Sequence, residues 1–311
     1  MYIVIMSRVA VVKYFGDFLG EKFSVSVYEN MIKAGIGFVA GNLSLNEYFK
    51  QLFPGGAVGI KTNCLTPFNA TPLNLTEAFV NILRENAGYD ENDLIIWERT
   101  NHELKKAGYT LNAASTGVRC LGTDVATIGY DRTFLNSGKV NSMVSKILTR
   151  MIEHNVNIPI LKDHSIAGMS AGLKNMYGAI HNPNKYHDNN CSPYAANINN
   201  LTPIRDKHRL TIIDAVKVQY DNGPGYAPHS IDSYNSLIIS EDPVAADCVA
   251  LEILNRIRAR NGKKSLKELG REVKYLDEAE KLGLGQANIA KIEIGVLAIA
   301  EDGSISEGKL F

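Results

Sequence analysis

Residues 162–178 of this chain read KDHSIAGMSAGLKNMYG, and they combine charged side chains with three glycines. An apolar run with strand character, residues 156–161, comes directly before them. We therefore expect Lys162, Asp163 and His164 to lie where a strand ends and a helix begins, which is where ligands bind in open α/β sheets. The helix is expected to begin at about residues 165–168. Its free backbone N–H groups would favour a phosphate or a carboxylate.

The length and charge of the chain limit the classes of protein to which it can belong. Its 311 residues suffice for one large domain or two modest ones with a substantial core. Lysine and arginine together number 33, as do aspartate and glutamate, so no overall field attracts nucleic acid or an anionic membrane surface. No apolar run reaches the roughly 18 residues of a membrane span. We expect neither a nucleic-acid partner nor a membrane.

Four cysteines are widely separated in the chain, at Cys64, Cys120, Cys191 and Cys248. No CxxC pair occurs among them, so no single segment can supply a zinc knuckle or an iron–sulfur cluster. A reducing cytoplasm is the simplest location for a protein of this size that does not need disulfides. The apolar N-terminal residues are followed almost at once by Arg8, and we expect no secretory signal.

The spacing of apolar residues predicts alternating strands and helices in the first half of the chain. Strands are expected at residues 8–14, 57–61, 93–98 and 156–161, with a weaker strand at 117–124. Helices are expected at residues 24–40, 45–53, 75–87, 101–107 and 139–154, and residues 122–138 are expected to be irregular. Three glycines near the end of the first helix weaken that prediction. A strand, a helix and a strand in succession are typical of a parallel βαβ unit.

The second half of the chain continues the alternation. Strands are expected at residues 209–218, 237–240 and 292–299, and helices at 194–201, 243–260 and 266–282. Asp242 and Pro243 suit the N-cap and the first position of a helix. We predict one Rossmann-like, doubly wound α/β domain over residues 1–311, with a mostly parallel sheet, helices on both faces and loop insertions. A lid-like loop at about 181–193 and a helical elaboration at about 243–283 complete the prediction.

Lys61 and Asn63 follow a short apolar strand and are candidates for holding a ligand oxygen. A lysine supplies three donors on a compact charge, and an asparagine supplies both a donor and an acceptor. The alternative is an ordinary loop lysine beside an asparagine that stabilises a turn. Cys64 is interpreted as a small buried residue and not as a nucleophile.

His164 is the candidate for proton transfer or metal ligation, because the usual histidine pKa near 6.5 permits both at neutral pH. In the alternative interpretation, His164 caps or hydrogen-bonds a loop. Lys174 is expected to act as an anion clamp, or as a base if burial lowers its pKa, and Asn175 to orient the ligand. Near the end of a helix, a lysine also has the simpler role of stabilising the helix dipole.

Two aspartates are candidates for the same cleft. Asp214 follows a strongly apolar strand segment, and Asp247 lies early in the helix that begins after Asp242. Two carboxylates can bind a hard cation such as Mg²⁺, or one of them can act as a base. A buried Asp247 would need a partner, for which Lys61 or Lys174 are the candidates.

The loop at residues 181–193 contains His181, His187, Asp188 and Cys191, which are side chains that borderline-soft metal ions accept. The same loop is rich in asparagine and proline, and these residues also gather in surface loops because they form turns. Polar loops beside sites often close over a ligand. A weak metal site and a lid are therefore both open for this segment.

Four blocks of sequence, taken together, resemble the domain-of-unknown-function 362 family. They are Lys61-Thr62-Asn63, the segment from His164 to Gly178, Asp214 ahead of Gly223-Pro224-Gly225, and the segment from Ser240 to Asp247. The resemblance implies an α/β fold and a shared pocket, and it implies no known reaction. Some relatives carry a ferredoxin-like cluster module that is absent here, so we do not expect this chain alone to encode an iron–sulfur cluster.

The function predicted from these observations is that of an enzyme that binds a small anionic substrate or cofactor at the strand ends. Lys61, Asn63, Asn175 and Asp214 would bind the substrate, and His164, Lys174 and Asp247 would be catalytic. The reaction class stays open, with a slight preference for redox or cofactor-related metabolism that rests on the resemblance. The alternative is a metal-, cluster- or ligand-binding protein without turnover. A divalent metal, a redox partner protein and a homo-oligomer also remain open.

Overall fold

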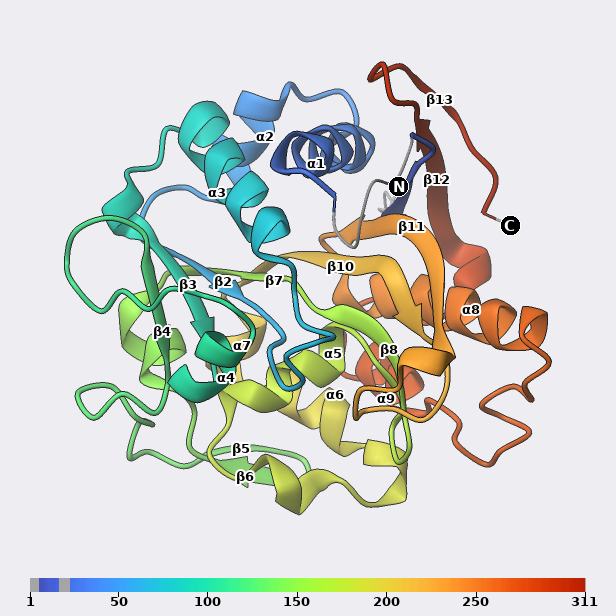
Figure 1. Ribbon diagram of the computed structural model, residues 1–311. Helices are drawn as coiled ribbons and strands as arrows, with labels where there is room; N and C mark the ends of the chain where they lie inside the picture. The colour runs from blue at the N-terminus through green and yellow to red at the C-terminus, as the bar shows by residue number, and fades with distance from the viewer. Residues whose placement is uncertain (1–5, 17–22, 311) are drawn as a thin grey trace, which may run out of the picture.

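A computed structural model describes residues 6–16 and 23–310 of the chain (Figure 1). A mixed sheet runs through the molecule in the order β13-β12-β1-β11-β10-β7-β2-β3-β4. Its strands are β1 (Ser7–Tyr14), β2 (Val58–Lys61), β3 (Leu94–Glu98), β4 (Arg119–Gly122), β7 (His154–Asn157), β10 (His208–Gln219), β11 (Ile231–Ser240), β12 (Ile292–Ile299) and β13 (Ile305–Glu307). Neighbouring strands are parallel from β10 to β4 and between β1 and β12, and β11 and β13 run antiparallel to their neighbours. The prediction of a mostly parallel α/β sheet is confirmed.

Helices cover both faces of the sheet (Figure 1). One face carries α1 (Val25–Ala40), α2 (Leu45–Leu52) and α3 (Leu73–Ala87), and the other carries α5 (Gly172–Asn175), α6 (Tyr194–Asn199), α8 (Pro243–Arg260) and α9 (Tyr275–Lys281). Two short helices, α4 (Asn101–Lys106) and α7 (Thr202–Arg205), follow β3 and α6. Alternate residues of β1 serve the two cores: Val11 packs on the α8 side and Val12 on the α1 side. Among the residues that the structure describes, no helix has the length and apolar character needed to cross a bilayer.

Gly35 in α1 has a packing role. A Cβ atom added at Gly35 would lie 2.6 Å from the Cδ1 atom of Ile239 and 3.0 Å from the Cγ2 atom of Val12. A side chain there would force the helix away from the sheet, so the low helix propensity of glycine is offset by close approach. The helix predicted at residues 24–40 is confirmed despite its glycines.

The parallel strands change direction of progression at β2. The chain leaves β2 towards β3 and β4 on one side, whereas it leaves the neighbouring strand β7 towards β10 on the other side, so the two connections diverge. In open α/β sheets such a switch point leaves a crevice at the carboxyl ends of the strands. The segments after β2 and β7 therefore begin beside a natural binding position.

Four predicted elements are wrong in whole or in part, and three of them lie outside residues 162–178. Residues 139–154 do not form one helix: a hairpin of β5 (Leu135–Ser137) and β6 (Val140–Ser142) precedes a five-residue π-helix, Ile147–Met151, and residue 154 already belongs to β7. The apolar run at 156–161 is divided between β7 and β8 (Ile160–His164) around Pro159, which cannot donate a backbone hydrogen bond. Of the helix predicted at 266–282, only α9 forms.

The segment of residues 162–178 begins with a β-hairpin, and the prediction of a helix that starts at residues 165–168 is wrong. Strand β8 pairs antiparallel with β9 (Gly168–Ser170), and the turn needs a positive φ of 77° at Gly168. The ring atom Nδ1 of His164 accepts the backbone N–H groups of Ile166 and Ala167, each at 3.1 Å. The histidine thus satisfies backbone donors that the predicted helix would have offered to a ligand.

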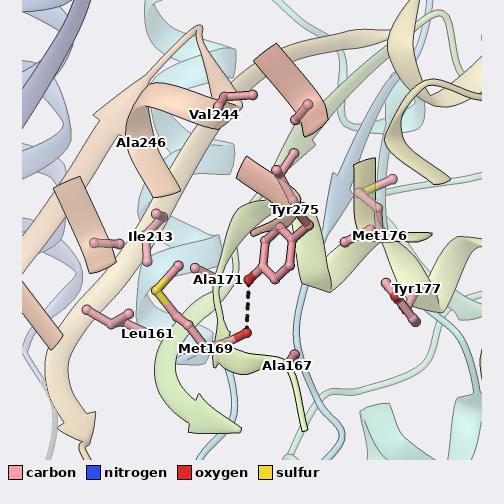
Figure 2. Packing of buried hydrophobic residues seen from close by; sticks show 14 of the residues in the cluster. Leu161, Ala167, Met169, Ala171, Met176, Tyr177, Ile213, Val244, Ala246 and Tyr275 are labelled. Carbon is pink, nitrogen blue, oxygen red and sulfur yellow. Dashed lines mark hydrogen bonds between the residues drawn. The ribbon is translucent and has the colours of Figure 1, made fainter. Parts of the chain in front are cut away.

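The hairpin rests on the core of the α8 face. Figure 2 shows Met169 and Ala171 beside Tyr275 of α9, whose hydroxyl donates to the Met169 carbonyl at 3.1 Å, and Leu161 belongs to the same core. Tyr275 is fully buried, so this hydrogen bond forms away from water. The hairpin is therefore held to the C-terminal helices by both packing and a polar contact.

Helix α8 begins as the sequence predicts, with Asp242 as its N-cap. The Oδ1 atom of Asp242 accepts the N–H groups of Val244 and Ala245 at 2.9 Å, and Oδ2 accepts that of Gln286 at 2.9 Å. Oδ2 also accepts the hydroxyl of Ser7 in β1. One carboxylate therefore joins the helix, the first residue of the interior strand β1 and a distant loop.

Replacing Asp242 by alanine is expected to lower the free energy of unfolding by about 2 kcal/mol, because the cap and the contact with Gln286 are lost together. Urea denaturation measures the change. Asp242→Asn is the matched control, since asparagine still caps helices well but offers one acceptor oxygen, and its loss is expected to be smaller. Equal losses in the two variants would contradict a capping role.

Candidate functional site

A cavity of about 130 Å³ lies at the carboxyl ends of β2 and β3, beside β8 and α5. Its wall includes Asn63, Glu98, Arg99, Glu103, Lys162, His164, Lys174, Asn175, Tyr177, Asn184 and His187. The volume is below the roughly 300–1,000 Å³ of sites for drug-sized ligands, so it suits a small polar molecule. Five residues named from the sequence meet there: Asn63, His164, Lys174, Asn175 and His187.

Strand alternation places Lys162 and His164 on the cavity side of β8 and Asp163 on the other side. The Oδ1 atom of Asp163 accepts from the Nη1 atoms of Arg258 at 3.1 Å and Arg271 at 2.9 Å. Its Oδ2 atom accepts the N–H of Gly223 at 2.9 Å. This network fixes the strand from behind and thereby positions both side chains of the cavity.

Lys61 is fully buried in an ion pair next to the cavity. Its Nζ atom lies 2.6 Å from Oε1 of Glu98 and donates to the carbonyl of Thr62 at 2.6 Å. Glu98 also accepts the N–H groups of Cys64 at 2.9 Å and Arg99 at 2.7 Å. The lysine charge is thus compensated, and the pair organises the loops that follow β2 and β3.

Glycine at position 178 lets the chain pass over this ion pair. A Cβ atom built there would lie 3.0 Å from Oε1 of Glu98 and 3.2 Å from Nζ of Lys61. A larger residue would have to displace the buried ion pair of Lys61 and Glu98, which explains why position 178 is a glycine.

A chain of amide groups crosses the floor of the site. Asn63 Nδ2 donates to Asn175 Oδ1 at 3.0 Å, and Asn175 Nδ2 donates to Asn157 Oδ1 at 2.7 Å. The Oδ1 atom of Asn63 faces Nζ of Lys162 at 3.4 Å. These contacts fix the direction of each amide, so the two asparagines predicted to bind substrate lie together in the cavity wall.

Lys162 and Lys174 are the two buried cations of the cavity, with 1% and 7% of their surface exposed. In the part of the chain that the structure describes, neither ammonium group forms an ion pair with a carboxylate. Burial lowers the pKa of each lysine to about 8. The Glu98 carboxylate, whose charge raises the pKa of Lys162, is already paired with Lys61. Two ammonium groups that share a small cavity and form no ion pair of their own make it attractive to an anion.

Lys174 has an unusual set of neighbours. Its Nζ atom lies 3.0 Å from Nε2 of His187 and 3.3 Å from the ring centroid of Tyr177. The Nδ1 atom of His187 lies 3.0 Å from the carbonyl of Pro183, and because a carbonyl only accepts, Nδ1 carries the hydrogen. Nε2 of His187 therefore has a free lone pair and accepts from Lys174.

His164 has the opposite tautomer. Its Nδ1 atom accepts two backbone N–H groups, so the hydrogen is on Nε2. Burial, reinforced by the charges of Lys174, His187 and others, lowers the pKa of His164 to about 3. Near neutral pH, His164 is therefore uncharged and donates a hydrogen bond through Nε2–H. This arrangement suits a residue that orients a ligand oxygen better than one that accepts a proton.

Asp247 lies beneath α5 and outside the cavity wall. Its two carboxylate oxygens accept the N–H groups of Gly172 at 2.6 Å and Leu173 at 3.0 Å. The ion pair predicted between Asp247 and Lys61 or Lys174 is wrong, because backbone N–H groups at a helix start satisfy the carboxylate. Burial nevertheless raises the pKa of Asp247 to about 7.

Asp214 and Asp247 do not share a cleft. Asp214 lies in the middle of β10, not at its end, and accepts the N–H of Val216 at 2.9 Å. It occupies the same face of the strand as Ile212, which packs on the α1 side, while Asp247 contacts α5 on the opposite face. Burial raises the pKa of Asp214 to about 7. The two carboxylates are therefore separated by the sheet.

The loop at residues 181–193 contributes one wall of the cavity through Pro183, Asn184 and His187. His181 instead packs edge-on against the ring of Tyr130, at 5.0 Å between centroids. Across residues 6–16 and 23–310, no three or more His, Cys, Asp or Glu side chains are arranged to hold a metal ion. The predicted set of His181, His187, Asp188 and Cys191 does not converge.

The sequence interpretation missed Arg99, Glu103 and Tyr177 of the cavity wall, and it placed Lys162 at the strand end without giving it a role. Lys162 had a detectable signal, since a residue two positions before His164 on one strand must share its face. Arg99 and Glu103 follow β3, which neighbours β2, and that adjacency comes from the sheet order.

Together, fold and site define an α/β protein with a cation-lined cavity at the ends of its parallel strands. The family model described as Domain of unknown function (DUF362) matches residues 58–252, and the chain belongs to that family, as the sequence blocks predict. No curated protein matches the chain. Its structure is similar to that of a Northeast Structural Genomics Consortium target from Thermotoga maritima, with 12% identity and a TM-score of 0.42. The similarity covers 77% of this chain and 61% of that one, so the chain spans less than two thirds of that protein's length.

Asp247→Asn is expected to lower the free energy of unfolding by about 1–3 kcal/mol, because an amide NH₂ group would face a backbone N–H of α5. Chemical denaturation at neutral pH measures this loss. Asp277→Asn, on the exposed side of α9, is the matched control and is expected to change stability little. An Asp247→Asn protein as stable as the control would show that the carboxylate does not hold α5.

Proposed function

We propose that this protein is an enzyme that binds a small anionic substrate in the cavity beside β8 and α5. The observation that carries the proposal is the pair of buried ammonium groups of Lys162 and Lys174, neither of which forms an ion pair among the described residues. Burying a cation without a carboxylate costs stability, and such a cost is a common mark of a functional site. A bound anion would supply the missing compensation.

The two lysines have different neighbours and therefore different roles. Nζ of Lys162 faces the oxygen atoms of Asn63 at 3.4 Å and Thr66 at 3.2 Å, which favour the charged ammonium form. Lys162 is the residue that binds the anionic group. Lys174 faces the nitrogen lone pair of His187 and can pass a proton to it, so this pair is the centre of proton transfer.

His164 completes the arrangement as a neutral donor through Nε2–H. A neutral donor beside two cationic ones suits a ligand that carries an uncharged oxygen next to its anionic group. A binding protein without turnover would need the cations but would have no use for a lysine in contact with a proton acceptor. The contact between Lys174 and His187 therefore favours an enzyme over a binding protein.

Lys162→Met is expected to weaken binding of inorganic phosphate and glycolate by roughly tenfold to a hundredfold, because one charge-assisted hydrogen bond is lost. The same change is expected to raise the free energy of unfolding by about 1–2 kcal/mol, because a buried unpaired cation is removed. Calorimetric titration and urea denaturation measure the two effects.

Lys291→Met, at an exposed position, is the control for Lys162→Met and is expected to change neither quantity. Loss of binding with loss of stability would point to a structural role for Lys162. Absence of binding of either anion to the wild-type protein would contradict the proposed function itself.

The affinity for glycolate is expected to decrease as the pH rises through about 8. Burial holds the pKa of Lys162 and Lys174 at about 8, below the ordinary 10.5, so both are charged below that pH and neutral above it. Glycolate stays ionised across this range, so the loss reports on the protein, at roughly tenfold per pH unit for each lysine that must be charged. Titration calorimetry between pH 6 and about pH 10 checks this. An affinity that stays constant to the alkaline end would contradict the assignment to these lysines.

A further inference from the structure

We propose that Lys174 is a covalent nucleophile, whose amine forms an imine with the carbonyl carbon of a small carboxylic acid bearing an aldehyde or ketone group. This inference rests on the proposed function, because it uses the same cavity, and it adds the class of substrate. It follows from comparing the surroundings of the three buried lysines at the site.

The three lysines differ in what accepts their protons. Lys61 faces a carboxylate at 2.6 Å, and Lys162 faces a side-chain amide oxygen and a hydroxyl. Only Lys174 of these three faces an imidazole lone pair, at 3.0 Å. Burial lowers the pKa of both Lys162 and Lys174, but of the three lysines only Lys174 has an imidazole nitrogen beside it that can relay a proton from its ammonium group. Burial and the Lys174 charge lower the pKa of His187, so the proton is held there only in passing and is returned to the leaving oxygen.

The other groups of the cavity suit a carbonyl compound with a negative charge. Lys162, which is charged below a pH of about 8, provides a cation for the carboxylate, and Nε2–H of His164 provides a neutral donor for the carbonyl oxygen. The rings of His164 and His187 lie 5.8 Å apart between centroids, nearly parallel at 27°. The proton acceptor for Lys174 and the donor for the substrate oxygen are therefore on neighbouring rings.

The step is balanced without a further reactant. The Lys174 ammonium gives one proton to Nε2 of His187, and the resulting amine attacks the carbonyl carbon to form a C–N bond. The carbonyl oxygen takes up protons from His187 and from the attacking nitrogen and leaves as water. One ammonium and one carbonyl compound thus yield one protonated imine and one water molecule.

The test is reductive trapping of the full-length protein with pyruvate and sodium cyanoborohydride, followed by peptide mass mapping. A reduced adduct is expected on Lys174, at about tenfold or more the rate seen at any exposed lysine, because its pKa of about 8 leaves more neutral amine near neutral pH. Trapping is expected to accelerate as the pH rises through about 8. Propionate, which lacks the carbonyl group, should give no adduct.

His187→Phe distinguishes proton acceptance from a general effect on folding. Its trapping is expected to be roughly tenfold slower than wild type near pH 7 and to approach wild type at alkaline pH, where Lys174 loses its proton without help. A slow rate at every pH would overturn the role of His187 as acceptor.

The failure of this inference can be separated from failure of the proposed function. If glycolate binds in a Lys162-dependent way and pyruvate leaves no adduct on Lys174, imine formation is overturned and anion binding stands. Adducts spread over exposed lysines at similar rates would also overturn the inference. If neither glycolate nor phosphate binds, the proposed function fails whatever the trapping shows.

Discussion

The carboxylate of Asp163 is the charge on which the arrangement of the site depends. It is almost fully buried between two guanidinium groups and a backbone N–H, and the strand that carries it also carries Lys162 and His164 on its opposite face. Removing one partner from such a pair typically costs about 3–5 kcal/mol, because a charge is left buried without compensation. The hairpin therefore cannot rotate or slip by one residue without exposing this carboxylate to the apolar core and withdrawing both cavity residues.

Charge is distributed differently on the two sides of that strand. Behind it, Asp163 is balanced by Arg258 and Arg271, and beside it Lys61 is balanced by Glu98. In front of it, Lys162 and Lys174 share a small cavity without such a partner among the described residues. Lys61, Glu98 and Asp163 are paired with opposite charges, and the buried carboxylates of Asp214 and Asp247 accept backbone N–H groups. In the described part of the chain, the two lysines of the cavity have neither kind of compensation, which packing alone does not require. Exceptions of this kind are expected where a ligand completes the structure.

The sequence predicted the fold better than it predicted the site. Period-two and helical patterns located β1, α1, β12 and the start of α8, where local propensity and burial agree. The pattern at residues 139–154 was misread because part of it pairs as a short hairpin, and pairing partners are not visible in a local window. The hairpin of β8 and β9 was not predicted because the backbone N–H groups of its turn are hydrogen-bonded by the His164 side chain, a contact that no local pattern indicates. Lys162 could have been found from strand alternation, whereas the contact of His187 with Lys174 depends on a loop returning across the chain.

From the sequence, residues 162–178 are expected to bind an anion through free backbone N–H groups at a helix start. The position of Asp247 means that an anion site there has to use side chains instead. The helix that does form, α5, already has its first N–H groups bound to that carboxylate, and glycine at position 172 leaves room for it, since a Cβ atom there would lie 2.9 Å from Oδ1. Because the Asp247 carboxylate already accepts these N–H groups and offsets the positive end of the helix dipole, the start of α5 has little left to bind an anionic ligand. Under the proposed function, recognition in the cavity depends on Lys162, Lys174 and His164, whose charge and donor pattern can be altered one residue at a time. Side chains that bind an anion can also donate a proton to it or accept a proton from it. Backbone N–H groups cannot exchange protons in this way, so only a site made of side chains combines binding with proton transfer.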